Sequence, residues 1–251
     1  MSDVTAVIIT KNEEKNIVDC LETLKWVKQI IVIDDFSDDR TADVARINGA
    51  EVFKHTLGRD FSKQRNFALA KCKTDWVLFI DADERVSEKL KKEIEYRLSE
   101  SKNTNGFIFN RKDILWGRTL NHGEMGKVKL LRLAKRESGE WQGKVHEAWK
   151  INGNVKELKN PLIHYPHQNI TTLFREINFY TSIRAEELRN KNLESSLYQI
   201  IFYPAGKFIM NYFIRLGFLD GIPGLIMANA MSMHSFLVRG KLWLSKRNNQ
   251  K

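Results

Sequence analysis

Short strand-like runs alternate with helical patterns through the first hundred residues. Four such runs lie at residues 4–10, 30–33, 51–55 and 76–80. The apolar run at 76–80 is too short for a helix and predicts a strand that is covered on both faces. Segments between the runs, such as residues 62–71, have helical character, so βαβ units with right-handed crossovers are expected. The pattern therefore predicts a doubly wound, mainly parallel α/β sheet.

The pattern loosens after residue 100. Short strand-like runs at 106–109 and 128–133 are separated by glycine, asparagine and charged residues, which predicts a smaller antiparallel region. From residue 171 onward, apolar positions recur at helical spacing. We therefore expect an α/β domain over residues 1–168 and a helical C-terminal appendage over residues 169–251.

Two carboxylates follow the run at 76–80, where a buried strand would end. Asp81 and Asp83 are spaced i, i+2, and the carboxyl ends of parallel strands open into the crevice where ligands bind. Mg²⁺ and Mn²⁺ are usually held by one or two carboxylates together with substrate phosphates. The pair therefore suggests a metal-bridged phosphate substrate, although a solvated acidic turn before a helix gives the same short motif.

Composition and charge narrow the class of protein. The chain has 251 residues, a net charge of +10 and two cysteines, which form no disulfide framework. Its first residues lack the basic and apolar regions of a signal peptide, so a reducing cytoplasm is expected. The positive charge predicts anionic partners. More than half of the excess lies from Leu197 to Lys251, where seven basic residues accompany Asp220 alone.

Four polar segments occur in a fixed order along the first hundred residues. They lie at residues 9–14, 33–39, 63–66 and 79–83. In order and spacing these segments resemble the nucleotide-sugar half of family 2 glycosyltransferases. A closer resemblance, to the branch that includes lipopolysaccharide core β-glycosyltransferases, rests on residues 144–147, 217–221 and 241–243.

The resemblance implies a GT-A type fold, a nucleotide-diphospho-sugar donor, Mg²⁺ or Mn²⁺ at the two aspartates, and inversion at the anomeric carbon. It places Asp35 against the uracil N3–H of a uridine donor and Asp83 on the metal. Asp81 would contact ribose or sugar hydroxyls and is a second candidate for the metal. The other residues implied to bind the donor are Thr10, Asn12, Glu13, Asp34 and Arg65. Arg65 suits a phosphate or a sugar, because a guanidinium makes bidentate contacts with oxyanions.

Displacement of a nucleoside diphosphate also needs a base for the acceptor hydroxyl. Glu147 is the candidate base, and a surface carboxylate paired with a nearby lysine is the alternative. Trp141 and His146 belong to the same aromatic island and are candidates to bind the acceptor. His164 is a candidate third metal ligand, although His146 could equally take that role and a structural histidine is also compatible with the pattern.

The C-terminal region interleaves apolar and aromatic residues with basic ones. Its longest uncharged run, residues 221–238, only just reaches the length of a spanning helix and is diluted by glycine, proline and polar residues. We therefore expect helices that lie in a lipid interface beside anionic headgroups, on the inner face of the cytoplasmic membrane. A helical cap or a homo-oligomer interface is the alternative.

The predicted activity is metal-dependent, inverting transfer of a hexose from a nucleotide sugar to a lipid-linked or lipopolysaccharide-type glycan. A nucleotidyltransferase is disfavoured because residues 11–14 contain no glycine. A nucleic-acid-binding role is disfavoured because no reader motif accompanies the charge. A non-catalytic scaffold that binds nucleotide sugars or membranes remains an alternative.

Overall fold

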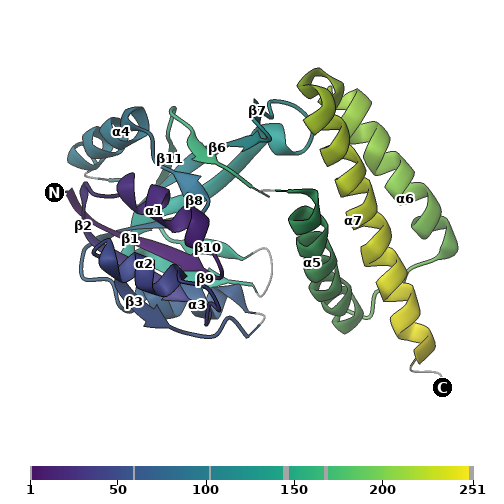
Figure 1. Cartoon of the computed structure of the whole chain (residues 1–251), viewed down its shortest axis with the longest axis horizontal. Helices are drawn as coiled ribbons and strands as arrows, with labels where there is room; N and C mark the ends of the chain where they lie inside the picture. Colours follow the sequence, from purple (N-terminus) through teal and green to yellow (C-terminus); the bar gives the residue numbers. More distant parts are fainter. Residues whose placement is uncertain (1, 59, 102, 144–146, 167–168, 249–251) are drawn as a thin grey trace. The chain divides into compact units, whose positions relative to one another are not determined.

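A computed structural model of the chain describes residues 2–58, 60–101, 103–143, 147–166 and 169–248. The chain divides into two compact units (Figure 1). The first unit comprises Met1–Arg111 and Lys129–His164, and the second comprises Lys112–Val128 and Tyr165–Lys251. The expected domain boundary at residue 168 stays a prediction. Residues 112–128 belong to the same compact unit as the C-terminal region.

The described strands of the main sheet follow the order β3-β2-β1-β4-β8-β6-β12-β5. Their bounds are β1 Ser2–Thr10, β2 Val27–Asp34, β3 Glu51–Lys54, β4 Trp76–Asp81, β5 Glu84–Arg85, β6 Gly106–Leu115, β8 Val128–Lys135 and β12 Leu162–His164. β1 is parallel to both β2 and β4, and β2 is parallel to β3. β8 runs antiparallel to β4, and β12 runs antiparallel to β5. The predicted fold class, a mainly parallel sheet with a smaller antiparallel region and a helical appendage, is confirmed.

Smaller strands complete this architecture. β11 (Val155–Glu157) pairs in parallel with β6. β9 (Gly139–Gln142) and β10 (Ala148–Ile151) form a separate antiparallel pair. β7 (Arg118–Thr119) forms a hairpin with the end of β6 inside the second unit.

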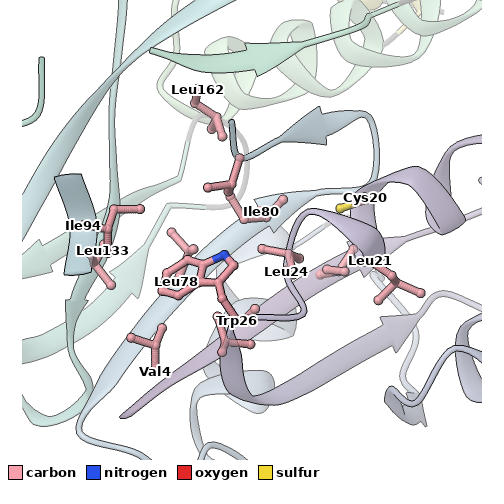
Figure 2. Close-up of a cluster of buried hydrophobic side chains, with 14 of the residues drawn as sticks. Val4, Cys20, Leu21, Leu24, Trp26, Leu78, Ile80, Ile94, Leu133 and Leu162 are labelled. Carbon is pink, nitrogen blue, oxygen red and sulfur yellow. The ribbon is translucent and has the colours of Figure 1, made fainter. Parts of the chain in front are cut away.

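Side chains of the central strands alternate between two hydrophobic clusters. On β4, Leu78 and Ile80 belong to one cluster, whereas Val77 and Phe79 belong to the other. Figure 2 shows the first cluster, which includes Cys20 together with Leu78 and Ile80. Because side chains of successive strand residues point to opposite faces, a strand buried on both sides needs an unbroken apolar run. This requirement explains the run at 76–80.

Helices cover both clusters. α1 (Glu14–Glu22) and α4 (Glu88–Ser99) contribute to the first cluster, and α3 (Phe61–Leu69) contributes to the second. The first unit also contains α2 (Thr41–Ile47) and the 3₁₀ turn η2 (Arg136–Ser138). Asp60 caps α3 by accepting the Lys63 N–H at 3.2 Å, and Ser87 caps α4 by accepting the Leu90 N–H at 3.2 Å. These caps fix where both helices begin.

The second unit is mainly helical. It contains the 3₁₀ turn η1 (Met125–Lys127), α5 (Ile170–Asn190), α6 (Leu197–Ile209), the π turn η3 (Met210–Ile214), the 3₁₀ turn η4 (Gly217–Asp220) and α7 (Gly221–Asn248). α7 packs against both α5 and α6. Leu173 and Ile177 of α5 share a buried cluster with Met227 and Ala230 of α7. Among the described residues, one helical stretch, Gly217–Ser245, is long and apolar enough to cross a membrane by length and composition, and 33% of its most apolar window is buried.

Candidate functional site

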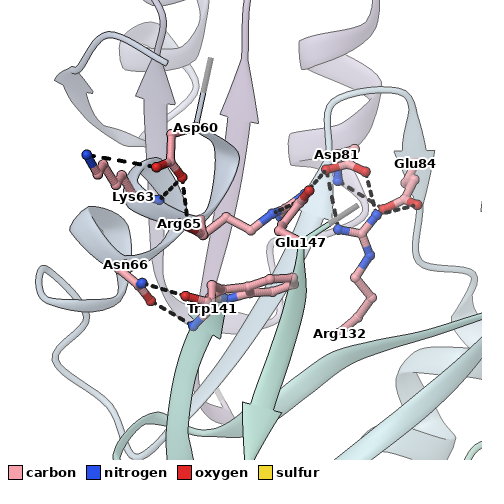
Figure 3. Close-up of polar contacts among 10 residues, drawn as sticks. Asp60, Lys63, Arg65, Asn66, Asp81, Glu84, Arg132, Trp141 and Glu147 are labelled. Atoms are coloured by element: carbon pink, nitrogen blue, oxygen red, sulfur yellow. Dashed lines mark hydrogen bonds and ion pairs between the residues drawn. The ribbon is translucent and has the colours of Figure 1, made fainter. Parts of the chain in front are cut away.

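Asp81, the last residue of β4, is held between two arginines (Figure 3). Arg132 of β8 contacts both carboxylate oxygens, with Nη1 3.4 Å from Oδ1 and Nη2 bonded to Oδ2. Arg65 of α3 donates from Nη2 to Oδ1 at 3.3 Å. Burial opposes ionisation of Asp81, but the two guanidinium groups outweigh it and hold its pKa well below the ordinary value. Asp81 is therefore a fixed negative charge.

Arg65 joins Asp81 to Glu147. Its Nε donates to Oε1 of Glu147 at 2.8 Å, while Nη2 reaches Asp81. The guanidinium carbon also lies 4.5 Å from the ring centre of Trp141 and 5.5 Å from that of Phe79, which are distances at which a cation is attracted to the ring face. The carboxylate motif and the predicted base thus share one buried arginine.

Glu84 adjoins this cluster and is completely buried. Its Oε2 accepts the Asp81 backbone N–H at 2.9 Å, and its Oε1 lies 3.3 Å from Nη2 of Arg132. Burial raises the pKa of Glu84, and the charge of Asp81 acts in the same direction. Glu84 and Arg132 together fix the backbone and the side chain of Asp81.

Asp83 and His164 form a second polar pair at the motif. Oδ2 of Asp83 is 3.1 Å from Nε2 of His164, and β12 brings His164 there by pairing with β5. A carboxylate and an imidazole are both ordinary ligands of divalent metals, and Mg²⁺ and Mn²⁺ characteristically complete their shells with phosphate oxygens and water. Within the described residues no cluster of three potential ligands occurs.

Thr10 and Asp34 lie side by side where β1 and β2 end. Both are buried, and Oγ1 of Thr10 and Oδ1 of Asp34 have no hydrogen-bond partner among the described residues. Buried polar atoms are normally satisfied, so unpaired ones suggest a missing ligand or water. The neighbouring Asp35 already accepts the Leu57 N–H at 2.8 Å and Lys11 Nζ at 3.1 Å. A uracil N3–H would have to share the Asp35 carboxylate with Lys11 or displace Lys11 from it.

A family model described as glycosyl transferase family 2 matches residues 5–178. This chain belongs to glycosyltransferase family 2. The predicted family is thereby confirmed. The lipopolysaccharide core biosynthesis glycosyltransferase LpsC of Rhizobium meliloti is 28% identical over 95% of this chain and 91% of its own length.

Two solved structures share the fold of this glycosyltransferase. S. aureus TarS 1-349 in complex with UDP has a TM-score of 0.51 and 15% identity, over 98% of this chain and 92% of that one. The glucosyl-3-phosphoglycerate synthase of Mycobacterium tuberculosis, in complex with Mn²⁺, UDP and glucosyl-3-phosphoglycerate, has a TM-score of 0.50 and 17% identity, over 77% and 81%. At these identities the likeness shows the fold alone.

The loops of the glycosyltransferase that carry Asn12 and Glu13 are tied to the loop after β2. Asn12 has a φ of +57°, a conformation that asparagine tolerates better than most residues. Its Oδ1 accepts the Asp38 N–H at 2.9 Å, and the Glu13 N–H donates to the Thr41 hydroxyl at 2.8 Å. These bonds give both residues a role in shaping the loops, and their direct contact with a donor stays a prediction.

Trp141 lies inside the glycosyltransferase fold instead of at its surface. Only 5% of the residue is exposed, and its ring stacks on Trp149 with centroids 5.4 Å apart. Asn66 holds β9 against α3 by exchanging two hydrogen bonds of 2.9 Å with the Trp141 backbone. The ring supports Arg65 and offers little surface on which an acceptor sugar could stack. His146 lies outside the described residues.

Proposed function

We propose that this glycosyltransferase moves a hexose, with inversion, from a UDP-sugar to a lipid-linked or lipopolysaccharide-type glycan with the help of Mg²⁺ or Mn²⁺. One observation carries the proposal: Arg65 bonds to both the candidate base Glu147 and Asp81. Asp81 lies two residues before Asp83, which contacts His164. A donor-anchoring motif and a base so close together match the two needs of the reaction, which are stabilisation of a leaving diphosphate and removal of a hydroxyl proton.

Asp83 and His164 would hold the metal, which supplies Lewis-acid stabilisation of the leaving diphosphate when it is bound. Arg65 and Arg132 hold Asp81 rigidly, so Asp81 can orient ribose or sugar hydroxyls without changing its own conformation. The unpaired oxygens of Thr10 and Asp34 support a polar ligand at the ends of β1 and β2. Asp35 would accept the uracil N3–H, in competition with Lys11.

Glu147 would act as the general base. Its side chain is only 14% exposed, and Arg65 fixes Oε1, which leaves Oε2 to take the proton of the acceptor hydroxyl. The acceptor oxygen then forms a bond to the anomeric carbon as the bond from that carbon to the diphosphate oxygen breaks. Attack from the face opposite the leaving group gives inversion.

The proposed acceptor is supported by a related protein, and the proposed location is supported by the C-terminal region. LpsC, whose name assigns it to lipopolysaccharide core biosynthesis, aligns over most of this chain, and this likeness supports a glycan acceptor of that kind. We place the protein in the cytoplasm, on the inner face of the cytoplasmic membrane, where its C-terminal helical region would meet lipid. Association of copies through the C-terminal helices is the competing use of that region.

The proposal is tested by calorimetry and turnover assays with a panel of UDP- and GDP-sugars, each with and without Mn²⁺. We expect at least one UDP-sugar to bind in a Mn²⁺-dependent way, and Asp83→Ala to abolish that dependence. Asp60→Ala, which changes a carboxylate that caps α3, serves as the control variant. If no nucleotide sugar binds under any metal condition, the transferase assignment is wrong. Binding without turnover on any glycan acceptor would favour the scaffold alternative.

A further inference from the structure

The second unit exposes an unusual number of large apolar side chains between residues 197 and 222. We call these residues the 197–222 surface. Eight of its large apolar side chains are more than half exposed, namely Leu197, Tyr198, Ile201, Phe202, Ile209, Phe213, Ile214 and Ile222. Soluble monomers rarely leave a contiguous apolar patch of this kind in water, and such patches commonly mark a binding surface.

Charged groups are almost missing from the exposed part of the 197–222 surface. The stretch contains three charged residues, Lys207, Arg215 and Asp220. Lys207 pairs with Glu124 at 2.7 Å, and Asp220 is buried beside His122 at 2.8 Å. Among the described residues of this stretch, Arg215 is the one exposed charge for which no ion pair is found, so the surface presents hydrocarbon rather than an electrostatic pattern to its partner.

The arrangement of α6 favours a fluid partner over a second protein face. None of the 13 residues of α6 is buried. Since successive helix residues are rotated by about 100°, the exposed residues Leu197, Tyr198, Ile201, Phe202 and Tyr203 spread around most of the helix. A flat protein face covers one stripe of a helix, whereas lipid chains can surround several sides at once.

We propose that the 197–222 surface inserts among the headgroups and upper acyl chains of a lipid bilayer, and that apolar insertion, not attraction to anionic headgroups, holds it there. The choice of a lipid partner rests on the proposed lipid-linked acceptor. Basic residues nearby are engaged within the unit: Lys241 donates to the Thr181 and Ser182 hydroxyls at 2.8 Å, and Arg239 lies over the Tyr203 ring at 4.2 Å. Charge therefore contributes less to membrane binding than the sequence indicates.

Packing within the second unit favours an interfacial position over a membrane span. α7 is long enough to span, but it packs against α5 through Leu173 and Ile177. α5 carries charged residues such as Arg184 and Glu187, which pair at 2.6 Å. A spanning α7 would draw these charges into hydrocarbon, which is costly. An interfacial α6 leaves α5 in water.

The test is flotation of the full chain with vesicles of phosphatidylcholine alone and with added phosphatidylglycerol, at low salt and at about 1 M salt, where charges are screened within about 3 Å. We expect flotation with both vesicles at both salt concentrations. The triple variant Phe213→Ser, Ile214→Ser, Ile222→Ser should lower the partition coefficient by on the order of tenfold or more. The control variant Ile47→Ser, Tyr96→Ser removes two exposed apolar residues of the first unit and should float like the parent chain.

Flotation that requires phosphatidylglycerol and disappears at high salt would overturn the proposal in favour of headgroup attraction. Absence of flotation, together with a dimer in sedimentation that the triple variant dissociates, would assign the surface to a second copy. UDP-sugar binding by the triple variant separates this proposal from the proposed function. Loss of flotation with intact donor binding is the expected result, whereas intact flotation without donor binding in the parent chain would refute the function alone.

Discussion

The first unit hides charged side chains, whereas the second exposes apolar ones to solvent. Arg65, Arg132 and Glu84 are buried in the first unit, although charged residues are rarely buried unless they are paired. Residues 197–222 of the second unit expose large apolar side chains, which are usually buried. Both departures cost stability in water. We interpret the first as preorganisation for the charge that develops on the leaving diphosphate during glycosyl transfer, and the second as preparation for a non-aqueous surrounding.

The largest effect is expected at the base. Glu147→Gln keeps the size of the side chain but cannot take a proton, so turnover should fall about 10²- to 10⁴-fold, while donor affinity stays within about threefold. The measurement is steady-state turnover with a matched donor titration. Glu140→Gln, an exposed glutamate of β9, is the control. Equal effects on turnover in both variants would show that Glu147 pairs with Arg65 but takes no proton from the acceptor.

Arg132→Met tests the cost of the buried charges. Removing the guanidinium leaves Asp81 and Glu84 without their shared partner, so the free energy of unfolding should fall by about 3–5 kcal/mol. Urea denaturation measures it, with Arg136→Met, a partly exposed arginine, as the control. Adding Glu84→Gln should restore part of the loss because it removes one of the stranded charges. Additive effects of the two changes would contradict the coupling.

Local patterns predicted the strands and the fold class, and this prediction is confirmed because each strand depends on a short segment of chain. The structure brings Arg65, Asp81 and Glu147 together, and the roles that the family resemblance gave them stay predictions. Arg132 and Glu84 were missed, since their roles arise from the antiparallel pairing of β8 with β4 and from burial beside Asp81. The one available signal was an arginine inside the apolar run 128–133.

Other differences have the same origin in long-range packing. Trp141 was expected to meet the acceptor, and its burial follows from the Asn66 bonds that hold β9 to α3. The basic C-terminal residues were expected to face headgroups, and this stays a prediction. Lys207 and Lys241 are bonded within their own unit. A charge is visible in a sequence, but the partner that neutralises it is not.

A smaller effect is expected at Asp39, a carboxylate of the first unit outside the arginine cluster. Burial opposes its ionisation, but hydrogen bonds from the Thr41 hydroxyl and from the N–H groups of Thr41 and Glu14 lower its pKa. Its stabilising effect is therefore present above the unfolded pKa of about 3.9 and is lost as pH falls through the lower folded pKa. Asp39→Asn should cost about 1 kcal/mol at neutral pH.

The measurement for Asp39 is urea denaturation of the parent chain and the variant at several pH values. The difference between them should shrink as pH falls below about 4. Asp43→Asn, which breaks only a surface pair with Arg46, should change little at any pH. A cost that stays constant down to low pH would mean that the charge of Asp39 contributes nothing.

The smallest effect is expected where the second unit differs most from an ordinary fold. Phe213 is 54% exposed, so Phe213→Ser should change the free energy of unfolding in water by within about 0.5 kcal/mol. Leu173→Ala, at a position that is 1% exposed in the same unit, should cost about 2–5 kcal/mol because it leaves a cavity. Urea denaturation of the two variants gives the contrast. A large loss from Phe213→Ser would mean that this ring packs against protein in solution, and the contrast between a charge-burying unit and an apolar-exposing one would then fail at that residue.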